Sequence, residues 1–436
     1  MHRSQTPRDP TDSSRGTSVS SFPQEGKRLF VSYRLNGAYE KPWVSDPKMK
    51  SVRCGNYIVY VFLAIGFACA AAIAFLITKP ALTKSQLCLV LDEDFKSLNK
   101  DIWSHEVALD GFGTGSFDWT TTDPKNTYVD DAGLHIVPTL TNETTTITND
   151  QIYSGYTLNL TSEGSCTGAV NTSACYIYSN STLGSLIPPV RSARITTKGK
   201  VGIRYGRVEV TAKLPKGDWL WPAIWMMPED SAYGVWPRSG EMDILEARGN
   251  DMDYPGGRNI FFSTLHWGPS SETDSYWQTM AVRVKRRTDF ADGFHTFGLE
   301  WTDKHIYTYY DSRLTQVFYT DFTANDPMWS RGSFAEKSEN NTLFTNPWEA
   351  STSTTGNAPF DKKFYLILNV AVGSRNGWFL DNVGQKPWVD AATNAQWTFW
   401  SNADKWLPTW AEGDARGMTV KSVKMWQSGS CGVTEL

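Results

Sequence analysis

The sequence lacks the short motifs of the common metal and phosphate chemistries. It has six histidines and six cysteines in 436 residues, with neither a Cys-x-x-Cys pair nor a His-Glu-x-x-His run. We therefore expect no catalytic metal ion and no cofactor. A phosphate-cradling glycine-rich loop and a Gly-x-Ser-x-Gly elbow are also missing. Their absence argues against nucleotide-dependent chemistry and against a serine hydrolase.

Neither sign of charge dominates the chain. Its 42 Lys and Arg stand against 46 Asp and Glu, and the formal net charge is −4. Residues 1–56 carry ten basic residues against five acidic ones, so the acidic excess lies in the remainder. A large domain with an acidic balance gives no support for a nucleic-acid partner.

Only one long hydrophobic run is present. Tyr57 to Ile77 is a stretch of 21 residues without a charged side chain, long enough to cross a bilayer as a helix. It lies too far from residue 1 for a cleaved signal peptide, and a buried core helix is the weaker alternative. We predict four parts, namely a basic cytoplasmic tail with a disordered start (1–56), a transmembrane signal anchor (57–77), a stalk (78–87) and one lumenal or extracellular domain (88–436).

The predicted orientation follows from charge and from glycosylation signals. Lys48, Lys50 and Arg53 precede the span closely, which favours a cytoplasmic N-terminus. All the Asn-x-Ser/Thr sequons follow the span, which indicates a type II membrane protein of the secretory pathway or cell surface. These sequons begin at Asn142, Asn159, Asn171, Asn180 and Asn340.

Four cysteines lie beyond the span, at Cys88, Cys166, Cys175 and Cys431. Four cysteines allow three pairings, and the sequence alone does not choose among them. We favour Cys166 with Cys175 as a loop staple, and Cys88 with Cys431 as a tie between the domain's two ends.

The most informative stretch runs from Glu241 to Glu246, with three acids among Met, Ile and Leu. Its length, β-branched content and Gly and Pro flanks predict a strand. Strict alternation would send Glu246 to the face opposite Glu241 and Asp243. A β-bulge at or near Leu245 would return it, so that three acids line one open surface.

A row of carboxylates suits glycoside hydrolysis. Retaining glycosidases use two carboxyl groups about 5–5.5 Å apart, one as nucleophile and one as acid/base. Mutual repulsion leaves one proton on such a row near neutral pH. A solvated acidic strand and a calcium-binding edge are the alternatives.

Tryptophans precede the acids. The run Gly217 to Pro228, read as a strand, places Trp219, Trp221, Ala223 and Trp225 on one face. Indoles stack on the C–H faces of sugar rings, so this row predicts a carbohydrate platform. Filling of the core is the alternative for any single tryptophan.

These segments resemble glycoside hydrolase family 16, in its laminarinase-type branch of endo-β-1,3-glucanases. The likeness covers roughly residues 90–430. It is carried by Trp236 to Glu246 with its Glu-x-Asp-x-x-Glu pattern, and by Pro189 to Gly217, Ser263 to Pro269, Phe294 to Trp301 and Leu366 to Gly373.

The resemblance implies an all-β, concanavalin A-like jelly roll of two antiparallel sheets, with a glycan across the concave one. It implies that Glu241 is the nucleophile, that Glu246 is the acid/base and that Asp243 tunes both. Trp221, Trp225, Trp236 and Trp267 are candidates for lining subsites. His266 is a candidate hydrogen-bond donor to a sugar hydroxyl, or equally a packed structural residue. Relatives also carry a structural calcium ion, whose ligands we do not identify here.

Three functions are open to such a chain. We favour a membrane-anchored, retaining endo-β-1,3- or β-1,3(4)-glucanase with a monomeric catalytic domain. A cell-wall transglycosylase shares the same glycosyl-enzyme and differs in its acceptor. A glucan-binding protein without turnover is the third, because some relatives of this fold bind β-glucan and have lost the acids. Here Glu241, Asp243 and Glu246 are all present.

Overall fold

The computed structural model describes residues 36–78, 82, 86–334, 338–339, 342–429 and 431. The chain divides into two compact units, Met1–Ala70 and Ala71–Leu436. The expected tail of residues 1–25 lies outside the described residues.

The predicted membrane span forms part of one long helix, α1 (Met49–Thr78). Met49 to Leu76 is long and apolar enough to cross a membrane. The helix begins at Met49 rather than at Tyr57, where the apolar run starts. Asp46 accepts a hydrogen bond from the backbone N–H of Lys48 at 2.8 Å just before it. Such a side chain satisfies free N–H groups at a helix start, and no proline interrupts the residues that follow.

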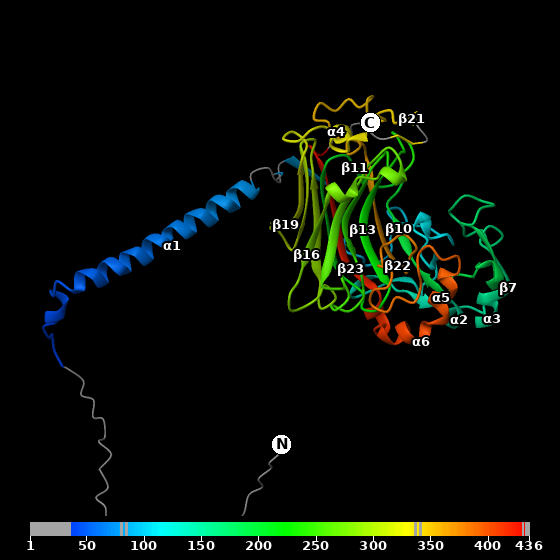
Figure 1. Cartoon of the computed structure of the whole chain (residues 1–436), viewed down its shortest axis with the longest axis horizontal. Coiled ribbons are helices and arrows are strands. Elements are labelled where there is room, and N and C mark those ends of the chain that lie inside the picture. The colour runs from blue at the N-terminus through cyan, green and yellow to red at the C-terminus, as the bar shows by residue number, and fades with distance from the viewer. Residues whose placement is uncertain are drawn as a thin grey trace, which may run out of the picture. The chain divides into compact units, whose positions relative to one another are not determined.

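Two large antiparallel sheets build the second unit (Figure 1). We call them the β12 sheet and the β14 sheet. The β12 sheet contains, in spatial order, β19 (Ser312–Asp321), β18 (His305–Tyr310), β17 (His295–Trp301), β12 (Gly206–Lys213), β23 (Met418–Ser428), β5 (Gly133–Ile136) and β4 (Thr127–Asp130), with β1 (Leu87–Glu93) also paired with β23. The β14 sheet contains β16 (Met280–Val284), β15 (Ile260–His266), β14 (Glu241–Ala247), β13 (Leu220–Pro228), β22 (Phe364–Val372), β10 (Arg194–Thr196) and β2 (Ser104–His105), with β11 (Gly202–Ile203) also paired with β22.

Shorter elements surround the sandwich. The helices are α2 (Thr141–Thr144), α3 (Asn149–Tyr153), α4 (Met328–Arg331), α5 (Ala395–Ser401) and α6 (Ala403–Trp406). The small sheets are β3 (Asp118–Thr120) with β9 (Val190–Ser192) and β6 (Thr139–Leu140), β7 (Ser154–Asn159) with β8 (Tyr176–Asn180), and β20 (Ser338–Glu339) with β21 (Thr342–Leu343). Two packed antiparallel sheets confirm the predicted jelly-roll class.

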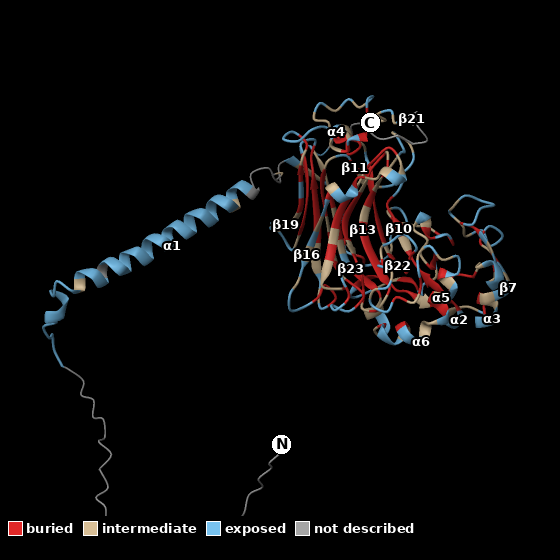
Figure 2. Cartoon of the chain, viewed as in Figure 1, coloured by how far each residue is buried: buried red, intermediate tan, exposed pale blue. Residues whose placement is uncertain are grey.

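The core lies between the two large sheets, where burial is most continuous (Figure 2). Every second residue of each strand contributes its side chain to this core, because successive side chains point to opposite faces of a sheet. Val208 and Val210 on β12 and Met242 and Ile244 on β14 are fully buried in one hydrophobic cluster. The acids lie on the opposite face of β14, away from this core.

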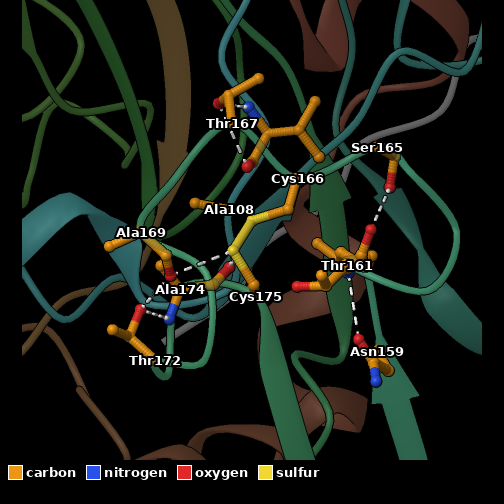
Figure 3. The surroundings of a disulfide bond; sticks show 12 residues. Ala108, Asn159, Thr161, Ser165, Cys166, Thr167, Ala169, Thr172, Ala174 and Cys175 are labelled. Atoms are coloured by element: carbon orange, nitrogen blue, oxygen red, sulfur yellow. Dashed lines mark hydrogen bonds between the residues drawn. A yellow bond between two sulfur atoms is a disulfide. The ribbon is translucent and has the colours of Figure 1, made fainter.

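Both favoured disulfides are present. Cys88 pairs with Cys431 across 343 residues, and Cys166 pairs with Cys175 across nine. Figure 3 shows the second bond beside Ala108 and Ala174, which form a small buried cluster with Cys175.

The sequon asparagines of the second unit differ in exposure. Asn142 and Asn171 are exposed, and Asn159 and Asn180 are half-buried. Asn340 lies outside the described residues. Their glycosylation stays a prediction.

Candidate functional site

The three acids occupy one face of β14, as the predicted bulge requires. Strand β15 pairs with Asp243 through Thr264 and with Glu246 through Phe262. Ile244 and Leu245 therefore stand together opposite the single residue Ser263, and both are fully buried. The extra residue restores Glu246 to the outer side of the sheet. We call this outer side, with Glu241, Asp243 and Glu246, the acid face.

Tryptophans hold the two outer acids. The indole N–H of Trp236 donates to Glu241 at 2.9 Å, and that of Trp221 donates to Glu246 at 3.1 Å. Each bond fixes a carboxylate oxygen and places a ring beside it. Both carboxylates are thus oriented before any ligand arrives.

The central acid is paired with a histidine. Asp243 is 2% exposed, and its Oδ2 lies 3.3 Å from Nε2 of His266. Nδ1 of the same ring lies 2.5 Å from Oδ2 of Asp274, just after the short 3₁₀ turn at Ser271–Thr273. Asp274 is itself held by the backbone N–H groups of Trp267 and Tyr276.

His266 is half-buried, and its carboxylate neighbours favour the charged imidazolium. Burial by itself lowers the pKa of an imidazole, but the bonds to Asp243 and Asp274 outweigh it. They hold the pKa of His266 well above its ordinary value. Carboxylates lie near both ring nitrogens, which fits the structural alternative for His266, and a bond from Nε2 to a sugar hydroxyl stays a prediction.

All three acids retain protons more readily than free carboxyls. Burial is the main cause, and it raises the pKa of Glu246 to about 7. Burial and the charge of Asp243 raise the pKa of Glu241. Burial and the charge of Glu246 raise that of Asp243. Near neutral pH the row holds both protonated and ionised carboxyls, and such a mixture both donates and accepts hydrogen bonds.

One more of the expected tryptophans, Trp225, and one unexpected tryptophan, Trp378, belong to the acid face. Trp225 pairs with Asp243 across β13 and β14 and donates its indole N–H to Asn369 at 2.7 Å. Trp221 stacks on Trp378, with ring centres 4.9 Å apart and planes 15° apart. The guanidinium of Arg248 covers Trp378 at 4.1 Å. Trp378 lies in the loop after β22, and no strand pattern marked it in the sequence.

Two tryptophans do not belong there. Trp267 has no exposed surface; its indole N–H donates to Thr279, and its ring packs near Phe334. The expectation that Trp267 lines a subsite is therefore wrong. Trp219 lies before β13 with a φ of 67° and is 1% exposed, so it too leaves the row. Its positive φ breaks the alternation on which the prediction depended.

An apolar edge borders the acid face on β16. Met280 and Val282 pair with Thr264 and Phe262 on β15, which places them on the same face as the acids. Both are exposed, as is Val284. Such a surface suits the C–H faces of a sugar or another apolar group.

Among the described residues, two groups have the spacing of metal ligands, Glu241 with Asp243 and His266, and Asp130 with His135 and Asp414. A ligating histidine must be neutral. Asp243 and Asp274 raise the pKa of His266, so a metal ion at the first group would have to displace the proton that these carboxylates favour. A structural calcium ion stays a prediction without assigned ligands.

We compared the chain with known protein families and proteins. A family model described as glycosyl hydrolases family 16 matches residues 135–363. A β-1,3-glucan-binding protein of Penaeus monodon is 39% identical over 376 residues, 84% of this chain and 98% of that protein. β-1,3-glucan-binding protein 1 of Galleria mellonella is 30% identical, over 78% of this chain and 63% of that protein. Glucan endo-1,3-beta-glucosidase A1 of Niallia circulans is 34% identical over 193 residues, 42% of this chain and 22% of that protein.

These relatives correct one expectation. The prediction of a membrane-anchored endo-β-1,3-glucanase is wrong, because the two proteins that match most of this chain are named as glucan-binding proteins. The physical reason for the error is that carboxylates and indoles also hold a sugar that is not cleaved. Their presence does not by itself require turnover.

Proposed function

Since this chain belongs to glycosyl hydrolases family 16, we propose that it binds β-1,3-glucan on the acid face. The observation that carries the proposal is the ring of indoles around the acids. Trp236 donates a hydrogen bond to Glu241, and Trp221 donates one to Glu246. Trp378 stacks on Trp221. The glucan-binding relatives support the same substrate class.

The acid face would hold a neutral sugar chain through two kinds of contact. Trp236, which is 41% exposed, and half-buried Trp378 offer apolar surface to the C–H faces of the rings. Glu241 and Glu246 are half-buried and partly protonated, so they accept and donate hydrogen bonds to hydroxyl groups. Direct sugar contacts then depend little on ionic strength, because the ligand carries no charge.

A membrane location is the second part of the proposal. The charge-free run inside α1 supports a single-pass anchor. The basic residues before it and the sequons after it support a type II orientation with the glucan-binding domain outside the cytoplasm. Resistance of the full-length protein to alkaline extraction from membranes tests the anchor. A mass decrease on enzymatic removal of N-linked glycans tests the orientation, and an unchanged mass would contradict it.

A second candidate function is chemistry on the O-glycosyl bond of the bound chain. The specific observation is that both Glu241 and Glu246 lie on one face, with the pKa of Glu246 raised to about 7. One carboxylate would attack the anomeric carbon while the other, still protonated, gives its proton to the departing oxygen. The second group would then take a proton from the acceptor, a water or a sugar hydroxyl, as the covalent bond breaks.

One experiment addresses both functions. The full-length protein is incubated with insoluble β-1,3-glucan, with cellulose and starch as control polymers. We expect saturable co-sedimentation with β-1,3-glucan and little with the controls. Equal binding to all three polymers would contradict the proposed specificity.

Soluble products from the same incubation are resolved by mass beside those of the Glu241→Gln variant. Shorter or longer oligosaccharides from the wild type alone would establish the second candidate. Identical product profiles from both proteins, with binding intact, would remove it.

A further inference from the structure

A cavity of about 520 Å³ lies away from the acid face, at the end of the β14 sheet where β13 begins. Four segments wall it, namely Asp218–Trp219, 250–255, 383–387 and the end of α6 with Thr409. Its volume lies within the range of small-molecule sites. Asn250 lies four residues beyond Glu246, so even a fully extended chain, at about 3.3 Å per residue, would separate the two positions by roughly 13 Å at most.

The polar side of the cavity is built around a buried amide. Asn250 is 1% exposed; its Oδ1 accepts from the backbone N–H of Trp219 at 3.1 Å, and its Nδ2 donates to Asp218 at 3.2 Å. The hydroxyl of Thr409 accepts from the backbone N–H of Asp218 at 2.9 Å. Asp218 is thereby presented to the cavity in one orientation.

One buried donor in this wall has no acceptor. Trp219 is 1% exposed, and its indole N–H finds no partner among the described residues. A buried N–H without an acceptor costs about 1–3 kcal/mol. Trp219 lines the cavity, so a ligand hydroxyl that reached this N–H would supply the acceptor.

The remaining wall combines aromatic rings with charges of both signs. Trp219, Tyr254 and Trp406 line it, and exposed Asp253 and Lys405 also belong to it. Asp251 is already paired with Arg258 at 2.9 Å. Acids outnumber the single lysine of the lining, which disfavours an anion. The three rings are 6% exposed or less, so a ligand would meet mainly donors and acceptors, a mixture that suits a neutral polyhydroxyl ring.

We propose that this cavity is a second sugar-binding site, which takes a glucose-like unit of the polysaccharide held on the acid face. The inference depends on the proposed glucan binding for its ligand. Two sites on one molecule raise the affinity for a polymer without raising it for a short oligosaccharide, because the second contact becomes intramolecular. The cavity would thus favour long or branched chains over fragments.

The test compares polymer and fragment binding by the full-length protein. The variant Asp253→Ala with Lys405→Ala removes two exposed side chains of the cavity, and Asp131→Ala with Lys421→Ala is the matched exposed control. We expect the cavity variant to bind insoluble β-1,3-glucan about tenfold more weakly or worse. Its affinity for a short β-1,3-gluco-oligosaccharide should equal that of the wild type and of the control.

A second readout observes the cavity directly. Glucose is added while the indole N–H resonance of Trp219, identified by Trp219→Phe, is followed by NMR. A saturable shift of that resonance supports the site. No shift, together with unchanged polymer affinity in the cavity variant, would overturn it. If the wild type binds no β-1,3-glucan but the Trp219 resonance still shifts, the proposed function fails and the sugar site stands.

Discussion

His266 and Asp274 form a half-buried ion pair beside Glu241 on the acid face, with Nδ1 of the imidazole 2.5 Å from Oδ2 of the carboxylate. The other ring nitrogen faces Asp243 at 3.3 Å. A positive charge therefore lies beside the row of acids, on the same face of the β14 sheet. It offsets part of the repulsion that three carboxyl groups on one strand would otherwise suffer.

Asp274→Asn should lower the pKa of His266. The substitution keeps a hydrogen-bond acceptor but removes a negative charge that favours the imidazolium, so we expect the pKa of His266 to decrease. An NMR titration of the histidine ring measures it. Asp311→Asn is the matched control, because Asp311 pairs with His295 at 2.9 Å. A pKa of His266 that is unchanged by Asp274→Asn would show that the carboxylates near Nε2, Asp243 and Glu241, hold the cation.

The stability of the domain should fall as pH rises through the neutral range. The acids of the row have raised pKa values in the folded state, so the folded protein binds more protons than the unfolded one above the ordinary carboxyl range. His266, with its own raised pKa, acts in the same direction. The stabilisation is complete below pH about 4.5 for Glu246 and is lost as pH passes about 7.

Glu241→Gln tests this dependence because it removes one of the titrating groups. We expect its melting temperature to fall less steeply between pH 5 and 8 than that of the wild type. Glu412→Gln, an exposed glutamate outside the acid face, is the control. A wild-type melting temperature that rises over this interval would contradict the assigned directions.

Trp221→Ala and Trp378→Ala should each weaken glucan binding. The two rings stack on one another, and a buried or stacked aromatic is a typical centre of binding energy. We expect about a tenfold loss of affinity or more, equivalent to about 1.4 kcal/mol, in co-sedimentation with β-1,3-glucan. Trp397→Ala is the control, since Trp397 is 39% exposed on α5 and contacts Tyr153 instead. Equal losses in all three variants would indicate a general effect on folding.

Removal of the Cys88–Cys431 disulfide should cost more stability than removal of Cys166–Cys175. The first bond spans 343 residues and the second nine, and the entropy that a cross-link takes from the unfolded chain grows with the closed loop. We expect a loss of about 2–5 kcal/mol for the paired serine substitutions at Cys88 and Cys431. Denaturant unfolding of both double variants measures the difference. A larger loss of unfolding free energy on removal of Cys166–Cys175 would show that the disulfides act mainly on the native state and not on the entropy of the unfolded chain.

Several features of the site were predictable from local pattern. The strand at Glu241 to Glu246 and its bulge followed from three acids among buried apolar residues, and the structure contains both. The same logic failed for Trp219, whose positive φ ends the alternation, and for Trp267, which is fully buried. Alternation assigns a face only while the backbone stays extended.

Asp274 and Trp378 were missed for a different reason. Both follow a strand of the β14 sheet in sequence but reach the acids only through turns. The direction of a side chain in a loop depends on backbone angles that no period describes. Neither residue type is unusual enough by itself to mark a site.

The sequence by itself determined the family, the sandwich class, the apolar run and the identity of the three acids, because each can be recognised from a continuous segment of the chain. Only the tertiary structure decided which partners surround those acids. The pairing of His266 with Asp274, the stacking of Trp221 on Trp378 and the choice between cysteine pairings all join residues that separate elements bring together. Contacts of this kind arise when sheets and loops pack, and no local signal in the chain specifies them.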